Sequence, residues 1–231
     1  MTASTKLTLS CLMLFLLSGK PSISDFTGKS TPLISKSTTT KNDPDNKLFV
    51  FVGEKIEISP VPYTRGAFDG GVKAKYRILQ RVYGHFDKDT IEFEAYSHSR
   101  RFLFTDYKTV LLYVSEHNGK LYQEKYLYDP LFKTKDGRWA GPYSSDYGHS
   151  NNEHTKVTPE KIDFAEEVSF PLKNIDAKNQ AIVYPEPYFR IVGGKAIAVY
   201  GNFVPELFKL KRDGVLTSRG LFGHKKAQKN P

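Results

Sequence analysis

Hydrophobic and polar side chains alternate with a period of two along several stretches of the chain. The first, "KLFVFVGEKIEI", opens with a continuous apolar run from Leu48 to Val52, passes Gly53, and then places Ile56 and Ile58 on one face. A period of two is typical of a β-strand, and a glycine inside such a pattern indicates a bend or bulge. We therefore expect a strand that starts near residue 47 and is interrupted at Gly53.

The stretch "VKAKYRILQRVYGHFDKDTIEFEAY" predicts an antiparallel hairpin of two half-buried strands. Apolar residues alternate with charged ones on both sides of a turn at residues 84–88. Placing the apolar faces together brings Arg77 or Arg81 opposite Glu92 or Glu94, and such exposed cross-strand pairs help to fix the register. Tyr76 and Phe93 fall in phase with the core positions of this hairpin.

Later stretches add further strands and turns. The apolar run in "YKTVLLYV" (107–114) predicts a strand covered on both faces. Asn118-Gly119 and Asp136-Gly137 are hairpin turn sequences, and Gly193-Gly194 predicts a turn between two more strands. Thr158-Pro159 has the residue order of a helix start, and "PELFKLKRDG" predicts a last helical turn. About eight short strands with one or two short helices predict a mainly β fold, either a small closed or partly open antiparallel barrel or a sandwich.

Three segments carry a family resemblance: "LFVFVGEKIEI", "KAKYRILQRVYGHFDKDTIEFEAY" and "FTDYKTVLLYV". Their order of strand types, with Val82-Tyr83-Gly84 at a turn, resembles the opening strands of netrin-like domains shared with tissue inhibitors of metalloproteinases. The resemblance covers about residues 47–115 and implies an OB-fold barrel. Tissue inhibitors chelate the protease metal through an amino-terminal cysteine, so the inhibitory mechanism is not carried over to this chain, whose only cysteine is Cys11.

The amino terminus reads as a secretory signal peptide. Lys6 precedes the apolar run Leu7–Leu17, which is short for a membrane span. Small residues at Ser22 and Ser24 predict cleavage before Asp25, and Ser18 and Gly19 mark an earlier alternative site. Loss of Cys11 with the leader would exclude disulfides and thiol chemistry. The expected organisation is a signal peptide (1–24), a flexible Ser/Thr/Lys-rich spacer (25–46), a single β-rich domain (47–208) and a basic carboxy-terminal tail (209–231), in a secreted or periplasmic protein.

The net charge of +9 comes mostly from the ends of the chain. Residues 209–231 hold seven basic residues and one acidic residue, so the domain itself is close to neutral. Nucleic-acid binding on an OB-fold uses exposed aromatic residues beside a basic groove. Because Tyr76 and Phe93 are expected in the core, the sequence argues against nucleic-acid binding. Polyanion or anionic-surface binding remains an alternative through four basic residues: Arg100, Arg101, Lys225 and Lys226.

Enzyme signatures are sparse. The sequence has no G-x-S-x-G elbow, no H-E-x-x-H helix and no phosphate-binding glycine loop, so we predict no catalytic residues and no cofactor. A metal site, with metal-dependent hydrolysis as its possible activity, is an alternative function for the polar loop "SSDYGHSNNEHT". Its candidate ligands are Asp146, His149, Glu153 and His154, although solvated loop residues would give the same pattern.

Aromatic residues concentrate between residues 122 and 147, and such residues are enriched at protein and carbohydrate interfaces. Strand alternation requires about half of them to face the core. The candidate partner surface is Tyr122, Tyr126, Tyr128, Trp139 and Tyr143. The sequence thus favours an exported, non-enzymatic binding module for an extracytoplasmic protein or carbohydrate, with metal binding and polyanion binding as alternatives.

Overall fold

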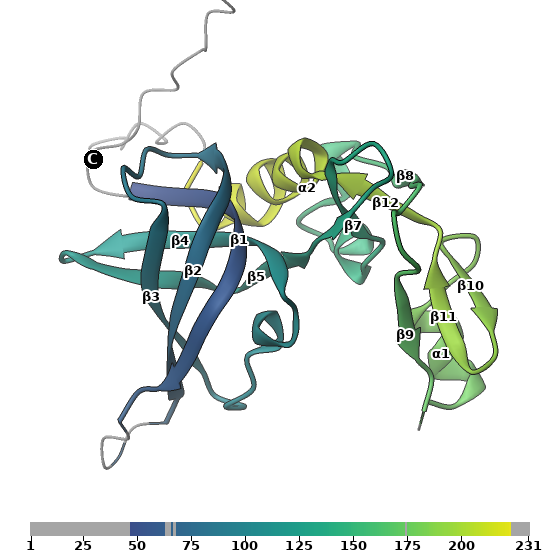
Figure 1. Ribbon diagram of the computed structural model, residues 1–231, viewed down its shortest axis with the longest axis horizontal. Helices are drawn as coiled ribbons and strands as arrows, with labels where there is room; N and C mark the ends of the chain where they lie inside the picture. The colour runs from purple at the N-terminus through teal and green to yellow at the C-terminus, as the bar shows by residue number, and fades with distance from the viewer. Residues whose placement is uncertain (1–46, 63–65, 67, 174, 223–231) are drawn as a thin grey trace, which may run out of the picture. The chain divides into compact units, whose positions relative to one another are not determined.

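The computed structural model describes residues 47–222, apart from 63–65, 67 and 174 (Figure 1). The predicted leader and spacer, together with Lys225 and Lys226, lie outside the described residues. The chain is mainly β, and five strands close a barrel in the order β1-β2-β3-β5-β4, in which only the β3–β5 contact is parallel. This arrangement is compatible with an OB-like fold. The barrel strands are β1 (Lys47–Pro60), β2 (Gly70–Tyr83), β3 (Thr90–Ser97), β4 (Thr109–His117) and β5 (Lys120–Pro130).

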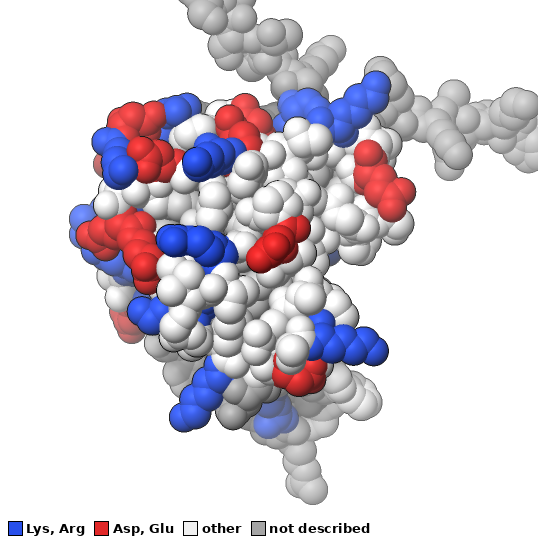
Figure 2. Space-filling model, turned by 90° about the vertical axis from the view of Figure 1, so that its right-hand side faces the viewer, with Lys and Arg blue, Asp and Glu red and all other residues white. Residues whose placement is uncertain are grey.

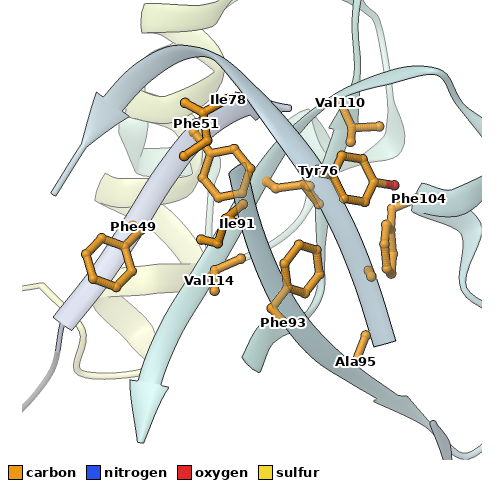
Figure 3. Close-up of a cluster of buried hydrophobic side chains, with 12 residues drawn as sticks. Phe49, Phe51, Tyr76, Ile78, Ile91, Phe93, Ala95, Phe104, Val110 and Val114 are labelled. Atoms are coloured by element: carbon orange, nitrogen blue, oxygen red, sulfur yellow. The ribbon is translucent and has the colours of Figure 1, made fainter. Parts of the chain in front are cut away.

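The inward-facing residues of these strands fill the barrel with aromatic and branched side chains (Figure 3). Tyr76 and Phe93 are both buried, as the alternation predicted, and their rings stack with centroids 5.7 Å apart. Phe104, from the 3-10 helix η1 (Leu103–Asp106), closes one side of this cluster against both rings. The barrel interior is thus a packed hydrophobic core.

The register of the β2–β3 hairpin differs from the expected one. Lys73 pairs with Glu94 and Lys75 with Glu92, whereas Arg77 lies opposite Thr90 in the hairpin and makes an ion pair with Glu54 of β1, 3.5 Å away. The basic and acidic faces do meet, but the pairing of Arg77 or Arg81 with these glutamates was wrong. The reason is the loop after β2, because the last residues of that strand pair only with β1 and the chain returns to β3 after Gly84–Asp89.

Strands β1 and β4 are covered on both faces, as their apolar runs predicted. Alternate residues of β4 point into the barrel, and the others, Leu111 and Tyr113, pack in a second apolar cluster with helix α2 (Val204–Lys211). The register of β1 against β2 shifts between Val52 and Gly53, which confirms the bulge. Helix α2 therefore lies on the outside of the barrel, against β1 and β4.

Two small sheets follow the barrel in the chain. The predicted turns at Asn118-Gly119, Asp136-Gly137 and Gly193-Gly194 are confirmed, and each contains at least one residue with positive φ. One sheet has the order β6-β7-β12-β8, and the other, β10-β11-β9, carries helix α1 nearby (Figure 1). Their elements are β6 (Phe132–Lys133), β7 (Trp139–Pro142), β8 (Glu160–Lys161), β9 (Ser169–Pro171), α1 (Ala177–Val183), β10 (Phe189–Val192), β11 (Lys195–Ala198) and β12 (Tyr200–Phe203).

Two predictions need correction, one of a helix and one of a segment boundary. No helix follows Thr158-Pro159, because Glu160 and Lys161 instead pair with β12, and a helix begins only at Ala177, after the Asp176 cap. The predicted tail at 209 begins inside α2, which the structure continues into a π-helical turn (Arg212–Leu216). Burial of the apolar stripe of α2 draws these residues into the fold. Within the described part of the chain, no helix has the length and apolarity needed to cross a bilayer.

Candidate functional site: a groove lined by tyrosines

A groove of about 630 Å³ runs along the outside of the barrel beside β5. Its volume lies within the range usual for small-ligand sites. A smaller hollow of about 220 Å³ adjoins it and shares Leu103, Tyr126 and Tyr128 with it. We call the larger hollow the tyrosine groove. Its barrel wall consists of Leu103, Tyr107, Tyr126, Tyr128, Asp129 and Pro130.

The opposite wall comes from the loop after β7 and from the β9–β11 sheet with α1. Helix α1 is seven residues long and buries none of its side chains, which leaves Ile182 65% and Val183 50% exposed. Tyr184, directly after α1, stacks on Phe170 with ring centroids 5.7 Å apart. The remaining residues of this wall are Pro142, Tyr143, Ser144, Ser145, Asp146 and Phe189. One rim of the groove is therefore apolar, and aromatic rings hold it in place.

Tyr143 occupies the centre of an aromatic stack. Its ring lies parallel to those of Tyr147 and Tyr188, at centroid distances of 5.2 Å and 4.0 Å. Both faces of Tyr143 are consequently covered, and stacking of this kind holds the ring in one orientation. Tyr147 is tied down further, since its hydroxyl donates to Oδ1 of Asn202 at 2.5 Å.

The hydroxyls of four groove tyrosines remain protonated at neutral pH because their pKa values are raised. Burial raises the pKa of Tyr128 to about 12, and burial is also the largest cause of the raised pKa values of Tyr107, Tyr143 and Tyr184. A neutral phenol can both donate and accept a hydrogen bond. The groove thus presents several neutral donor and acceptor groups between apolar walls.

A charged network lies at the base of the groove. Nζ of Lys211 contacts Oδ2 of Asp146 and lies 3.8 Å from Oδ1 of Asp129, while the Tyr113 hydroxyl donates to Oδ2 of Asp129 at 3.2 Å. Burial raises the pKa of Asp129 to about 6, although Lys211 opposes the shift. Burial acts to lower the pKa of Lys211, but the two carboxylates outweigh it and raise that pKa. Two carboxylates and one ammonium leave the base slightly negative at neutral pH.

Three separate parts of the fold position this network. Asp129 lies near the end of β5, Asp146 in the 3-10 helix η2 (Ser145–Gly148), and Lys211 at the end of α2. Of these three residues, only Asp146 was predicted from the sequence as a site residue, and Asp129 and Lys211 were not. A signal was present for the lysine, because Lys211 continues the apolar stripe of Val204 and Leu207 at helical spacing. A lysine on a buried helix face needs an acidic partner.

The structure does not bring the four proposed metal ligands together. Only Asp146 lines the groove, and it is paired with Lys211. Nε2 of His154 lies 2.7 Å from the backbone oxygen of Asp213, and Nδ1 of His149 accepts from the backbone N–H of Asn151. Glu153 is exposed in a short 3-10 turn with His154. Among the described residues, no three His, Cys, Asp or Glu side chains group closely enough to hold a metal ion.

The five proposed partner residues separate into two sets. Tyr126, Tyr128 and Tyr143 all line the tyrosine groove. Tyr122 lies elsewhere on the barrel, against Tyr96 at a centroid distance of 6.3 Å. Trp139 lines a different hollow, where Nζ of Lys133 lies 4.0 Å from the centre of its ring. Residues far apart in the sequence therefore build the groove, and three of the five predicted tyrosines and tryptophans contribute to it.

Two of the four basic candidates, Arg100 and Arg101, lie within the described residues. Arg101 borders the smaller hollow and lies 3.8 Å from Asp106, and Arg100 adopts a left-handed backbone conformation with φ of 55°. Figure 2 views the molecule from the right-hand side of Figure 1 and shows blue and red side chains interspersed with wide uncharged areas. No patch of a single sign is visible on that face.

No known family model, curated protein or solved structure matches this chain. The residues of the tyrosine groove are therefore the basis for a functional conclusion.

Proposed function

We propose that this protein is an exported, non-enzymatic binding module built on an OB-like barrel of the netrin-like type. Its ligand surface is the tyrosine groove. Export rests on the leader pattern of residues 1–24, and the netrin-like relationship rests on the strand pattern of residues 47–115 together with the strand order of the barrel. The ligand is then a protein or a carbohydrate of the extracytoplasmic environment.

The observation that carries this proposal is the gathering of exposed apolar side chains along a hollow. Leu103, Tyr126, Ile182 and Val183 are each at least 41% exposed, come from three segments of the chain, and line the same groove. Large apolar side chains that share one concave surface mark interaction sites more often than scattered ones do. Exposed rings such as that of Tyr126 supply contact area with little loss of side-chain entropy.

Binding fits this groove better than catalysis does. The ionisable groups at its base are already tied to one another, with Lys211 held by Asp146 and Asp129 held by Tyr113. A nucleophile or general base needs to be within reach of a substrate and to be activated by a neighbour, and the sequence contains none of the familiar catalytic motifs. The network acts in this proposal as the support that fixes the wall formed by residues 142–146.

The test uses the full chain and two sets of probes. One is a panel of neutral hexasaccharides (cellohexaose, xylohexaose, laminarihexaose, maltohexaose and hexa-N-acetylchitohexaose), whose binding is measured by calorimetry. The other is a random dodecapeptide library displayed on phage. The variants Tyr126→Ala and Ile182→Ser change exposed groove residues, and Ile191→Ser is a matched control because Ile191 is 42% exposed but does not line the groove.

We expect a probe from one set to bind saturably to the wild type, to bind the Ile191→Ser protein equally, and to lose most of its affinity for both groove variants. Equal binding to all four proteins would place the ligand site elsewhere and overturn the proposal. Saturable binding by neither probe set would overturn it as well.

A further inference from the structure

We infer that the tyrosine groove takes an uncharged oligosaccharide. The inference rests on the proposed binding function and names the class of its ligand. A sugar ring presents apolar C–H faces and a hydroxylated edge, so a matching protein site needs apolar or aromatic surface next to neutral donors and acceptors. The groove supplies both, on side chains whose positions are fixed by packing.

The tyrosine hydroxyl groups of the groove favour a polyhydroxylated ligand. Within the described part of the chain, the hydroxyls of five groove tyrosines have no hydrogen-bond partner, and none of them belongs to the buried polar atoms without a partner. Water therefore satisfies these hydroxyls in the free protein. A polyhydroxylated ligand replaces those water contacts one for one, because phenols donate and accept. The five residues are Tyr107, Tyr126, Tyr128, Tyr143 and Tyr184.

An apolar peptide side chain would use the same surface less well. Covering a tyrosine hydroxyl with an aliphatic group removes its water without supplying a new hydrogen bond, and an unsatisfied polar group is costly. The apolar rim at Ile182 and Val183 and the ring of Tyr126, which is 64% exposed, are available to contact the C–H face of a sugar. The combination of apolar side chains and tyrosine hydroxyls in the groove walls thus favours a sugar over a purely apolar ligand.

A carboxylate oxygen provides an acceptor beside these hydroxyls. The side chain of Asp146 is 38% exposed, and both of its side-chain partners, Ser144 and Lys211, contact Oδ2. Its other oxygen, Oδ1, has no partner among the described residues. A carboxylate can accept several hydrogen bonds, so Asp146 can accept from a sugar hydroxyl without giving up Lys211.

The charge at the base restricts the ligand further. Asp129 and Asp146 outnumber Lys211 at the base. The basic residues beside the groove are paired: Lys125, whose Nζ lies 5.8 Å from the centre of the Tyr126 ring, with Asp69, and Arg101 with Asp106. An anionic glycan would meet a slightly negative groove with no cation free to pair with it among its lining residues. The groove therefore favours a neutral oligosaccharide over a sulfated or uronic-acid polymer.

Calorimetric titration of the full chain with the neutral hexasaccharides, and with a sulfated heparin hexasaccharide for comparison, tests the inference. Tyr128→Phe and Tyr184→Phe each remove one hydroxyl but keep the ring. We expect each variant to weaken binding of the preferred neutral sugar by about 2- to 12-fold, which corresponds to the loss of one hydrogen bond. Tyr122→Phe, which removes a hydroxyl outside the groove, is the control and should bind like the wild type.

The outcomes separate the inference from the proposed function. Peptides from the display library that lose binding in Tyr126→Ala, in the absence of any sugar binding, would overturn the oligosaccharide but leave a binding groove. Preference for the sulfated sugar, or equal sugar affinity in the wild type and both Tyr→Phe variants, would also overturn the inference. Binding of neither sugars nor peptides would overturn both.

Discussion

The ammonium group of Lys211 lies 3.8 Å from a carboxylate oxygen of Asp129, and the two side chains are only 2% and 6% exposed. This pair joins the end of helix α2 to strand β5 beneath the tyrosine groove. Asp146 competes for the same ammonium and contacts it more closely. Asp129 is consequently the less well compensated of the two carboxylates, which agrees with the rise of its pKa to about 6 through burial.

Removal of the lysine should destabilise the fold strongly. Lys211→Met keeps most of the side-chain volume but leaves Asp129 buried and Asp146 without its ammonium partner, and breaking a buried pair in this way costs about 3–5 kcal/mol. The free energy of unfolding in urea at pH 7 measures the effect. The control is Lys135→Met, because Lys135 pairs with Asp163 at the surface, where such pairs contribute up to about 1 kcal/mol. Equal losses in the two variants would contradict a buried, interdependent network.

The raised pKa of Asp129 predicts a specific dependence of stability on pH. In the folded protein this pKa is about 6, compared with an ordinary value of 3.8, so the folded state binds more protons than the unfolded state between these values. The contribution of Asp129 to the free energy of unfolding is therefore highest below about pH 4, falls as the pH rises towards 6, and is constant above it.

Other carboxylates have lowered pKa values and oppose this trend, as Asp136 does beside Arg138. The measurement is therefore the difference in unfolding free energy between the wild type and Asp129→Asn, from urea titrations between pH 4 and pH 7.5. We expect the wild type to lose on the order of 2–3 kcal/mol relative to the variant over this range. A difference that is independent of pH would show that Asp129 titrates at its ordinary pKa.

Two buried tyrosine hydroxyls should respond in opposite ways to removal. The hydroxyl of Tyr76 is buried in the barrel without a partner among the described residues, whereas that of Tyr113 donates to Asp129. Removing an unsatisfied buried polar group relieves a cost of about 1–3 kcal/mol, and removing a hydrogen bond to a charged group loses about 1.5–3 kcal/mol. We expect Tyr76→Phe to raise the melting temperature and Tyr113→Phe to lower it. A lower melting temperature for Tyr76→Phe would indicate an internal water bound to its hydroxyl.

The local pattern of the sequence was sufficient for features that depend on neighbouring residues. The alternation placed Tyr76 and Phe93 in the core, and the residue types at Asn118-Gly119 and Gly193-Gly194 fixed two turns. The pairing of Arg77 could not be obtained in this way, because it depends on how many residues the loop after β2 uses before β3 begins. The helix predicted after Thr158 failed for a similar reason, since pairing with β12 outweighed a local capping signal.

The groove itself could not be predicted from local sequence patterns. Its walls combine Tyr128 of the barrel with Tyr184 from beyond helix α1, and nothing in the spacing of these residues indicates that they share a surface. The network at its base joins Asp129, Asp146 and Lys211 from three distant segments. The aromatic stretch between residues 122 and 147 contains three tyrosines that line the groove, but its pattern did not separate them from Tyr122 and Trp139.

Gly84, at the turn that carries part of the netrin-like resemblance, offers a matched comparison with Gly119. Both glycines have φ of +74°, a conformation that costs an L-residue about 1–2 kcal/mol. A side chain at Gly119 would meet no atom within 4 Å, whereas a Cβ at Gly84 would lie 2.2 Å from the backbone oxygen of Leu48 in β1. Backbone cannot move aside as a flexible side chain does.

We therefore expect Gly119→Ala to lower the free energy of unfolding by about 1–2 kcal/mol, which is the conformational cost alone. Gly84→Ala should lose roughly 2–5 kcal/mol, because the clash with β1 adds a cost of overpacking to the same conformational cost. Urea titrations of the two variants and the wild type measure the difference. Similar losses would mean that β1 yields at Leu48, and the turn after β2 would then be held by its φ value rather than by its close approach to the first barrel strand.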